Sequence, residues 1–313
     1  RASAMIRALL LLVTALVGTG GLVIGTAAGR ASSIAMVASS PTSASAPTGA
    51  LPAERYVATN RFRVKDGREA AFEKRWADRK SRLGLLDGFR FFCMMRRVHL
   101  GEKTYEDDIN YISCTVWENV ESFDAWKRGD AFKEAHGGGT IGGIATMLLA
   151  TAQNTKGKPK AAMWEGLLPV SMPPDASEES SGWREVIADG KTMLDDECFI
   201  AMNRFSVNEG MAGAFEQRFA ARESTLSTYD GFKGFVLLRR DGKDEDGFTH
   251  STWSVWNNRA AFEAWKSSES RAGKAKEGGA PAATAPSPPS LYARPPVPTF
   301  YEGILKLESP KGV

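Results

Sequence analysis

The 313-residue sequence contains few of the side chains from which disulfide scaffolds and protein-ligated zinc sites are built. Its three cysteines are Cys93, Cys114 and Cys198, and no CxxC motif is present. Three cysteines cannot all pair with one another, so the sequence disfavours a disulfide framework and a cysteine zinc site. Cys93 and Cys114 could approach each other across a hairpin, although buried thiols are the expected state.

The first 50 positions contain no acidic residue, and positions 51–313 carry no formal net charge. The first 50 positions carry Arg1, Arg7 and Arg30 but no lysine, so the other 37 basic residues balance the 37 acidic ones and the formal charge of +3 belongs to the leader. Hydrophobic residues at 42% and charged residues at 25% exclude collagen-like, fully disordered and polytopic membrane chains. A neutral folded region gives no electrostatic support for nucleic-acid binding.

We interpret residues 1–54 as a targeting leader with low sequence complexity. Residues 8–29 form an uncharged stretch of 22 residues, which is long enough to cross a bilayer once. Arginines flank this stretch, and a tract rich in Ala, Ser, Thr and Pro follows it up to Ala50. An acid-poor leader of this composition predicts organellar targeting, to a plastid first, with a membrane anchor and secretion as the alternatives. Membrane contact is expected only through this leader, if it is retained.

An internal duplication organises the rest of the chain. Residues 56–62 recur at 199–205, and further matches follow in the same order. Ordered matches of this kind mark repeated structural units. The sequence therefore predicts a module at 55–170, a linker at 171–196 and a second module at 197–309. The other matched pairs are 71–73 with 214–216, 87–89 with 230–232, 116–117 with 255–256, 125–127 with 264–266, and 165–168 with 302–305.

Each module is predicted to have the order strand, helix, strand, strand, helix, strand, which is ferredoxin-like and places the chain in the α+β class. Two such modules can pair their sheets into one barrel, which removes exposed sheet edges. The chain is therefore expected to be a monomer with an intramolecular, pseudo-dimeric α+β barrel. An additional apolar helix is expected at 141–152, as a lid over a pocket or as an ordinary core helix. In the first module the predicted strands are 56–64, 89–98, 110–117 and 162–170, and the predicted helices are 68–83 and 121–135.

Asn60, Trp126 and His136 are the candidate functional residues of the first module. Asn60 lies inside a predicted strand, where asparagine is unfavourable, so its amide must face water, bond to nearby backbone or bond to a ligand. Taken singly, a helical tryptophan is more often part of a core, and a histidine beside glycines at a helix end is more often solvated. The combination of the three is what favours a site.

The combination occurs in a pattern that resembles a known family. Thr59-Asn60-Arg61-Phe62 lies in the first predicted strand, and residues 126–136 read Trp-Lys-Arg-Gly-Asp-Ala-Phe-Lys-Glu-Ala-His in the second predicted helix. Asn-Arg followed by Trp-x-x-x-Asp-x-Phe-x-x-Ala-His is similar to the pattern of the IsdG-type haem-degrading monooxygenases, which belong to the antibiotic-biosynthesis monooxygenase superfamily. The resemblance in fold spans both modules, but the full motif occurs only in the first.

The resemblance implies a role for each residue. His136 would be the axial ligand of haem iron through a neutral imidazole nitrogen. Trp126 would press on the porphyrin face and enforce a ruffled macrocycle, and Asn60 would donate a hydrogen bond on the distal side of the iron. Haem would be both substrate and cofactor, with O2 and an external electron donor, a reductase or a ferredoxin-like protein, as further requirements. The implied reaction is oxidative ring opening with release of iron.

The second module departs from this pattern. Asn203 and Trp265 persist, but Ala275 occupies the position that aligns with His136. We therefore interpret the second module as a degenerate partner that completes the barrel, which predicts one haem per chain. His99, at the start of a hairpin loop, and His250, without acidic or cysteine neighbours at metal-binding spacing, are weaker candidates.

The sequence thus predicts a haem-degrading monooxygenase whose catalytic module is residues 55–170. Two alternatives stay open because one fold can host many functions. One is a haem-binding carrier or sensor that keeps His136 without turnover, and the other is a cofactor-free monooxygenase that acts on an organic, quinol-like substrate. The spacing of Trp126 and His136, together with Asn60, favours haem over the cofactor-free alternative.

Overall fold

The structure is a computed structural model. It describes residues 49–79, 82–101, 105, 107–136, 138, 140–172, 186–222, 224–242, 246–276 and 290–312. Most of the predicted leader, including the uncharged stretch at 8–29, lies outside these residues. Among the helices described, none is long and apolar enough to cross a membrane.

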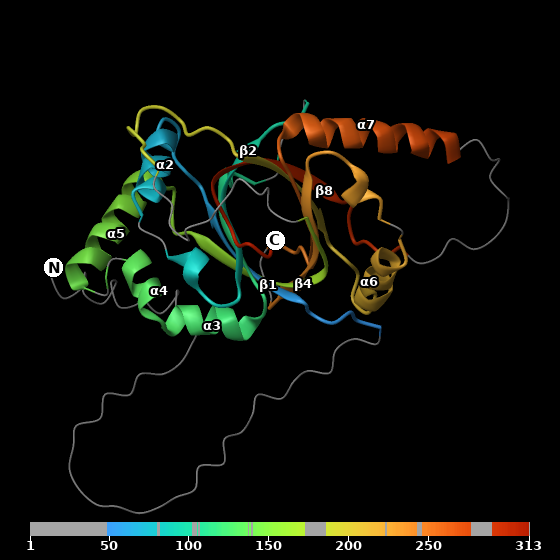
Figure 1. Cartoon of the computed structure of the whole chain (residues 1–313), viewed down its shortest axis with the longest axis horizontal. Coiled ribbons are helices and arrows are strands. Elements are labelled where there is room, and N and C mark those ends of the chain that lie inside the picture. The colour runs from blue at the N-terminus through green and yellow to red at the C-terminus, as the bar shows by residue number, and fades with distance from the viewer. Residues whose placement is uncertain are drawn as a thin grey trace, which may run out of the picture. The chain divides into compact units, whose positions relative to one another are not determined.

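The first module has the predicted order of strands and helices (Figure 1). The predicted helix at 68–83 is shorter than expected, because it ends at Ala77 and is followed by a separate 3-10 turn, η1 (Leu83–Leu85). The additional apolar helix is present and extends to Asn154. The elements are β1 (Arg55–Phe62), α2 (Glu69–Ala77), β2 (Phe89–Val98), β3 (Tyr111–Trp117), α3 (Val120–Arg128), α4 (Asp130–Ala135), α5 (Ile141–Asn154) and β4 (Lys160–Ser171).

The second module repeats this order without counterparts of α4 and α5 among its described residues. Its two helices lie on the opposite side of the barrel from α2, α4 and α5 (Figure 1). The predicted linker at 171–196 begins one residue early, because Ser171 is the last residue of β4, and its described residues 186–196 contain neither helix nor strand. The elements are β5 (Cys198–Phe205), α6 (Ala212–Ala220), η2 (Leu226–Thr228), β6 (Phe232–Asp241), β7 (His250–Trp256), α7 (Arg259–Lys276) and β8 (Val297–Glu308).

The strands form one closed barrel in the order β1-β3-β2-β8-β5-β7-β6-β4. The last strand of each module pairs with one strand of its own module and one strand of the other. Strand β4 pairs with β1 and with β6, and β8 pairs with β5 and with β2. All these pairs are antiparallel, and closure leaves no free edge among the described strands. The predicted pair of ferredoxin-like modules in a pseudo-dimeric α+β barrel is therefore confirmed.

A bulge marks each place where the two modules join. Leu168 in β4 has a φ of 51° and Leu305 in β8 has a φ of 55°, and the pairing register shifts beside each of them. A left-handed backbone is unfavourable for leucine, so this conformation costs free energy that the surrounding pairing must offset. Because bulges increase local twist, the two bulges help the exchanged strands to curve into the barrel.

The barrel interior and the outer faces have separate hydrophobic cores. One buried cluster draws side chains from all the strands and includes Val57, Trp164, Trp253 and Tyr301, so it fills the inside of the barrel. Residues that alternate with these along the strands face outward and pack under the helices. For example, Tyr56 and Ala58 in β1 pack with Phe123 of α3.

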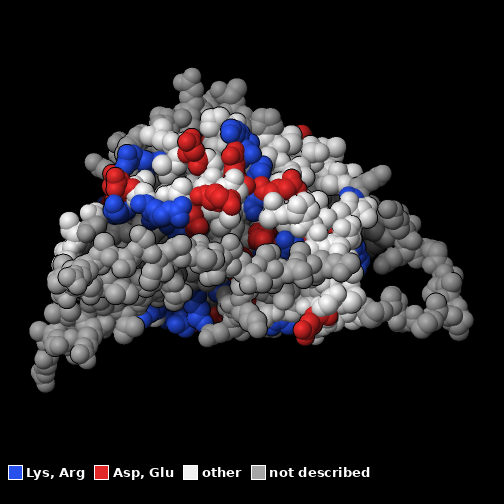
Figure 2. Space-filling view, turned by 90° about the horizontal axis from the view of Figure 1, so that it is seen from below, with Lys and Arg blue, Asp and Glu red and all other residues white. Residues whose placement is uncertain are grey.

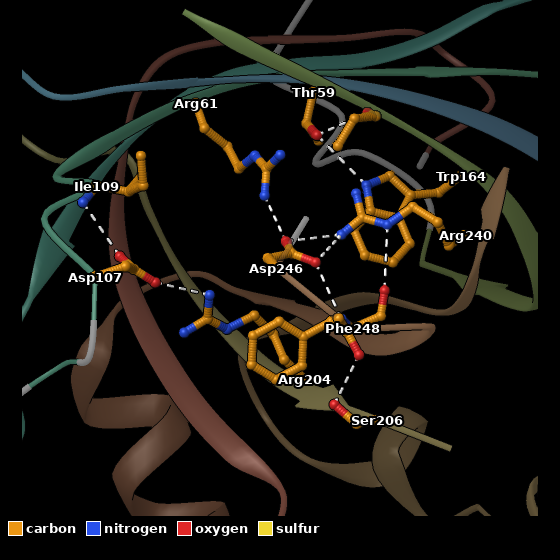
Figure 3. Close-up of polar contacts among 12 residues, drawn as sticks. Thr59, Arg61, Asp107, Ile109, Trp164, Arg204, Ser206, Arg240, Asp246 and Phe248 are labelled. Atoms are coloured by element: carbon orange, nitrogen blue, oxygen red, sulfur yellow. Dashed lines mark hydrogen bonds and ion pairs between the residues drawn. The ribbon is translucent and has the colours of Figure 1, made fainter. Parts of the chain in front are cut away.

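Ion pairs at one end of the barrel interior cross from one module to the other (Figure 3). Arg61 of β1 pairs with Asp246, which also receives Arg240 of the second module. The repeat-related Arg204 of β5 pairs with Asp107 at 2.9 Å, and Asp107 also receives Arg97 of the first module. These contacts are reciprocal, so each module supplies the acid that holds the other module's first strand.

A buried carboxylate fastens the first helix of each module to the sheet. Glu73 of α2 is fully buried and accepts hydrogen bonds from Arg96, from the Tyr111 hydroxyl and from the backbone N–H of Leu194 in the linker. Burial, followed by the charge of Glu73, raises the pKa of Tyr111, so the phenol stays protonated and can donate.

The second module has an equivalent buried carboxylate, which binds different partners. Glu216 of α6, also fully buried, accepts from Arg239, from His250 Nε2 and from the backbone N–H of Leu51. Each segment that precedes a module therefore binds to the other module's helix.

The charged surface agrees with the balanced composition of residues 51–313. In the face seen in Figure 2, Lys and Arg lie interspersed with Asp and Glu, and no large field of one sign covers its described part. Isolated exposed ion pairs of this kind contribute little to stability, so the buried pairs described above matter more.

Removal of the second module should open the barrel. A chain that ends at residue 196 lacks β5–β8, and this exposes the edges of β2 and β4 that pair with β8 and β6. We expect such a chain to aggregate or to dimerise through these edges. Size-exclusion chromatography with light scattering measures this directly, and a stable monomer with the activity of the full chain would show that the second module is not needed to complete the barrel.

Candidate functional site

Asn60 lies on the outward face of β1, between residues that pack under the helices. Ala58 contributes to the cluster that contains Phe123, and Phe62 contributes to the cluster that contains Phe72 of α2. The half-buried Asn60 side chain makes one hydrogen bond in the described structure, a long one of 3.5 Å from Nδ2 to Ser113 Oγ. It does not bond to nearby backbone, which was the structural alternative for this residue. Its amide hydrogens are therefore weakly engaged and could be donated to a ligand.

Trp126 is the half-buried end of an aromatic stack on α3. Its ring lies 5.4 Å from that of Trp117 in a stacked arrangement and 5.7 Å from that of Phe123, with distances measured between ring centroids. Phe132 of α4 meets the Trp126 ring edge-on at 5.0 Å. The indole is therefore held rigidly by neighbours on two helices and one strand, so it can impose a shape on a planar ligand.

A break at Gly129 brings His136 back toward Trp126. The predicted continuous helix at 121–135 is wrong at this point: α3 ends at Arg128, and Gly129 adopts an extended backbone with φ −82° and ψ 170° before α4 begins. A side chain at position 129 would lie 3.4 Å from the carbonyl oxygens of Ala125 and Trp126, which is tight. Because the chain turns here, the ring centroids of Trp126 and His136 lie 6.2 Å apart.

The His136 ring is fixed in orientation and in protonation state. It stacks on Phe132 with centroids 4.0 Å apart, and its Nδ1 lies 2.7 Å from the Phe132 carbonyl oxygen. A carbonyl can only accept, so Nδ1 carries the proton and Nε2 keeps its lone pair. Burial lowers the pKa of His136 to about 4, and the nearby positive charge of Arg79 acts in the same direction. His136 is thus a neutral imidazole with a free Nε2, as a metal ligand requires.

Arg79 is a functional candidate that the sequence analysis missed. Its guanidinium lies 4.0 Å above the Trp76 ring, and burial together with the charge of Arg75 lowers the pKa of Arg79 to about 10. Within the part of the chain that the structure describes, no carboxylate pairs with it. A half-buried guanidinium without a counter-charge is unfavourable, so this side chain is suited to an anionic group of a ligand. A cationic residue near the end of an expected helix is too common a feature for sequence to have singled it out.

The remaining histidines have other surroundings. His99 is exposed, as expected, and its ring lies 4.8 Å from that of Tyr105. His250 has no acidic neighbour at metal-binding spacing in the sequence, but the fold brings Glu216 of α6 to 3.2 Å from its Nε2. Across the described ranges, no three His, Cys, Asp or Glu side chains are grouped so that they could hold a bare metal ion. A single neutral histidine is suited to a metal ion that is already bound by another ligand, as iron is bound by the porphyrin in haem.

Comparison with known proteins gives the family. The sequence profile described as "Antibiotic biosynthesis monooxygenase" matches residues 55–138 and 198–273, one segment in each module. The chain belongs to this family.

Individual relatives agree with this assignment. A "Heme oxygenase (staphylobilin-producing)" of Staphylococcus haemolyticus (strain JCSC1435) is 35% identical over 81 residues, which are 26% of this chain and 72% of that protein. The resemblance to IsdG-type members of the family is confirmed by this similarity.

Comparison with solved structures gives matches at low sequence identity. The crystal structure of a candidate monooxygenase of Fusobacterium nucleatum has a TM-score of 0.51 and 10% identity, and the match covers 82% of this chain and 95% of that one. A candidate monooxygenase of Lactobacillus acidophilus covers 82% and 96%, with a TM-score of 0.46 and 8% identity. The first of these similarities shows the fold alone.

The second family domain fills the equivalent region with aromatic side chains. Phe300 of β8 lies 5.5 Å from Phe262 and 6.3 Å from Phe199 between ring centroids, next to the Trp256–Trp265 stack. The repeat-related residue of the first domain is Met163, which is smaller and flexible. In the second domain α7 runs unbroken through Ser268, the counterpart of Gly129. The two domains therefore differ in the helix break and in how much aromatic volume fills the space under the helix.

The low pKa of His136 makes stability depend on pH. The pKa is about 4 in the folded chain and 6.5 in an unfolded chain, so between these values the unfolded chain binds more protons. The stabilisation is complete above pH 6.5 and is lost as pH falls toward 4, by up to about 3 kcal/mol. We therefore expect the free energy of unfolding to fall more steeply with acidification in the native protein than in His136→Phe.

Denaturant unfolding at several pH values between 7 and 4 measures this difference. The matched control is His99→Phe, which alters an exposed histidine and should show the pH dependence of the native protein. A His136→Phe variant whose pH dependence equals that of the native protein would contradict the assignment of a depressed pKa to His136.

Proposed function

We propose that the first domain is a haem oxygenase of the IsdG type, which opens the porphyrin ring with O2 and external electrons and releases iron. The observation that carries this proposal is the state of His136: a neutral imidazole, stacked on Phe132, with Nδ1 bonded to a carbonyl and Nε2 free. The similarity to a staphylobilin-producing heme oxygenase supports the choice of haem over an organic substrate without a metal.

In this proposal each residue has a task that follows from its surroundings. His136 Nε2 would bind the iron, and the hydrogen bond from Nδ1 to the Phe132 carbonyl would make the imidazole a better electron donor. Trp126, held by Trp117 and Phe123, would contact the porphyrin face and press on it. Haem itself would supply the oxygen chemistry when bound.

Asn60 and Arg79 would act on the polar parts of the complex. The weakly engaged Nδ2 of Asn60 would donate a hydrogen bond where negative charge develops, and a donor placed in this way contributes about 3 kcal/mol in other enzymes. Arg79 would pair with an anionic side group of the ligand, which would relieve the cost of its own burial. An external reductase or a ferredoxin-like protein would deliver the electrons. The expected targeting of the leader, to a plastid first, remains part of the proposal.

Haem binding through His136 is tested by titration with hemin. We expect the full chain to shift the Soret band of hemin, and His136→Ala to abolish that shift because the iron loses its protein ligand. His99→Ala, which removes an exposed histidine, should behave like the native protein. An unchanged spectrum in His136→Ala would remove His136 from the ligand role.

Turnover is tested separately, with Asn60→Ala and its repeat-related control Asn203→Ala. In air, with ascorbate and catalase, the native protein should lose its Soret band and form a tetrapyrrole that mass spectrometry identifies. Asn60→Ala should still bind hemin but degrade it at least about 100-fold more slowly, whereas Asn203→Ala should have the native rate. A Soret band that persists undiminished in the native protein would instead indicate a haem carrier.

A further inference from the structure

The outward face of α5 is apolar although it faces solvent. Ile141 has 80% of its surface exposed and Leu149 has 62%, values that are unusual for such side chains in a helix. All the exposed positions of α5 recur at helical spacing, so they form one stripe along its length. The stripe consists of Ile141, Gly142, Ala145, Thr146, Leu149, Ala152 and Gln153.

Helix α5 is bonded to the rest of the domain, so the exposure of its outer face does not result from a detached helix. Arg75 of α2 donates to the Met147 carbonyl at 2.8 Å, and Arg68 donates to Asn154 Oδ1 at 3.1 Å. Lys65 Nζ donates to the Ala152 carbonyl at 2.8 Å, near the carboxyl end of the helix. Thr140 caps the amino end by accepting from the N–H of Gly143. Because both ends and the middle are bonded, the opposite face is presented outward in a fixed orientation.

The sequence within and just after α5 carries basic but no acidic residues. Residues 135–164 contain no aspartate or glutamate, and the helix itself contains no charged residue. Lys156, Lys158 and Lys160 follow it and are exposed. Lys156 Nζ lies 3.7 Å from the carboxylate of Asp66 in a loose, exposed pair. An exposed apolar stripe can enter the boundary between headgroups and acyl chains, and lysines beside it are attracted to anionic headgroups.

We propose that α5 docks this protein on the surface of an anionic lipid bilayer. Ile141 and Leu149 would enter the boundary between headgroups and acyl chains, and the lysines after the helix would contact the headgroup charge. This contact lies in the folded domain and is independent of the leader. It is also independent of the proposed haem chemistry, although α5 follows His136 closely in the chain, so docking would hold the candidate site near the bilayer.

The docking is tested with an environment-sensitive probe on the full chain. Leu149→Cys, labelled with a nitrobenzoxadiazole dye, reports on the stripe alone, because the three native thiols are buried. Vesicles of phosphatidylcholine mixed with phosphatidylglycerol should shift its emission to the blue. The matched control is Ile187→Cys with the same label, at a fully exposed position outside α5, and its emission should not change.

The lysines are tested by the partition coefficient onto the same vesicles. Lys156→Gln and Lys158→Gln should each lower it about fivefold, as expected for one cation near an anionic surface. Lys311→Gln, an exposed lysine distant in sequence, changes the net charge equally and should leave the coefficient nearly unchanged. Vesicles of phosphatidylcholine alone should bind more weakly than the mixed vesicles.

Three results would overturn the proposal. Vesicle binding without a spectral change at position 149 would mean that another part of the chain, such as the leader, makes the contact. A probe at position 149 that is already in an apolar environment without lipid would mean that the chain itself covers the stripe. Self-association without lipid that Leu149→Glu abolishes would mean that a second copy covers it.

Discussion

The structure depends on the exchange of the last strands between two repeated domains. β4 completes its own sheet and pairs with β6, while β8 completes its own sheet and pairs with β2. Neither domain can satisfy the edges of its sheet alone, because each outer edge needs the strand of the other. Reciprocal contacts follow from this arrangement. Arg61 binds Asp246, Arg204 binds Asp107, and the segment before each domain bonds to the other domain's buried glutamate. A covalent link between the two copies removes the entropy cost of assembling two separate chains.

The candidate site of the first domain depends on a local difference between the two repeated domains. Gly129 interrupts the second helix, and the turn stacks the His136 ring on Phe132, close to Trp126. In the second domain Ser268 continues the helix, and Phe300 adds an aromatic ring beneath it. The two copies thus differ: the first has His136 next to Trp126, whereas the second has Ala275 at the matching position and more aromatic packing.

Much of the fold could be predicted because repeats and periodicity are local signals. Residues 56–62 and their copies at 199–205 became β1 and β5 with nearly the predicted bounds, and α5 was found from its apolar composition. The break in the helix at Gly129 was missed, because a single glycine inside a helical pattern is usually tolerated. The partner of His250 was missed for another reason. Glu216 lies 34 positions from His250 in the sequence, and only packing of α6 against β7 brings them together.

The sequence by itself determined the family, the duplication and which copy carries the histidine, because these are properties of residue identity and order. It also contained the candidates Asn60, Trp126 and His136. Only the tertiary structure decided the protonation state of His136, the placement of Arg79 over Trp76 and the exposure of the α5 stripe. The physical reason is that burial, hydrogen bonding and the loss of counter-charges depend on contacts between distant segments, which barrel closure creates and which no local pattern encodes.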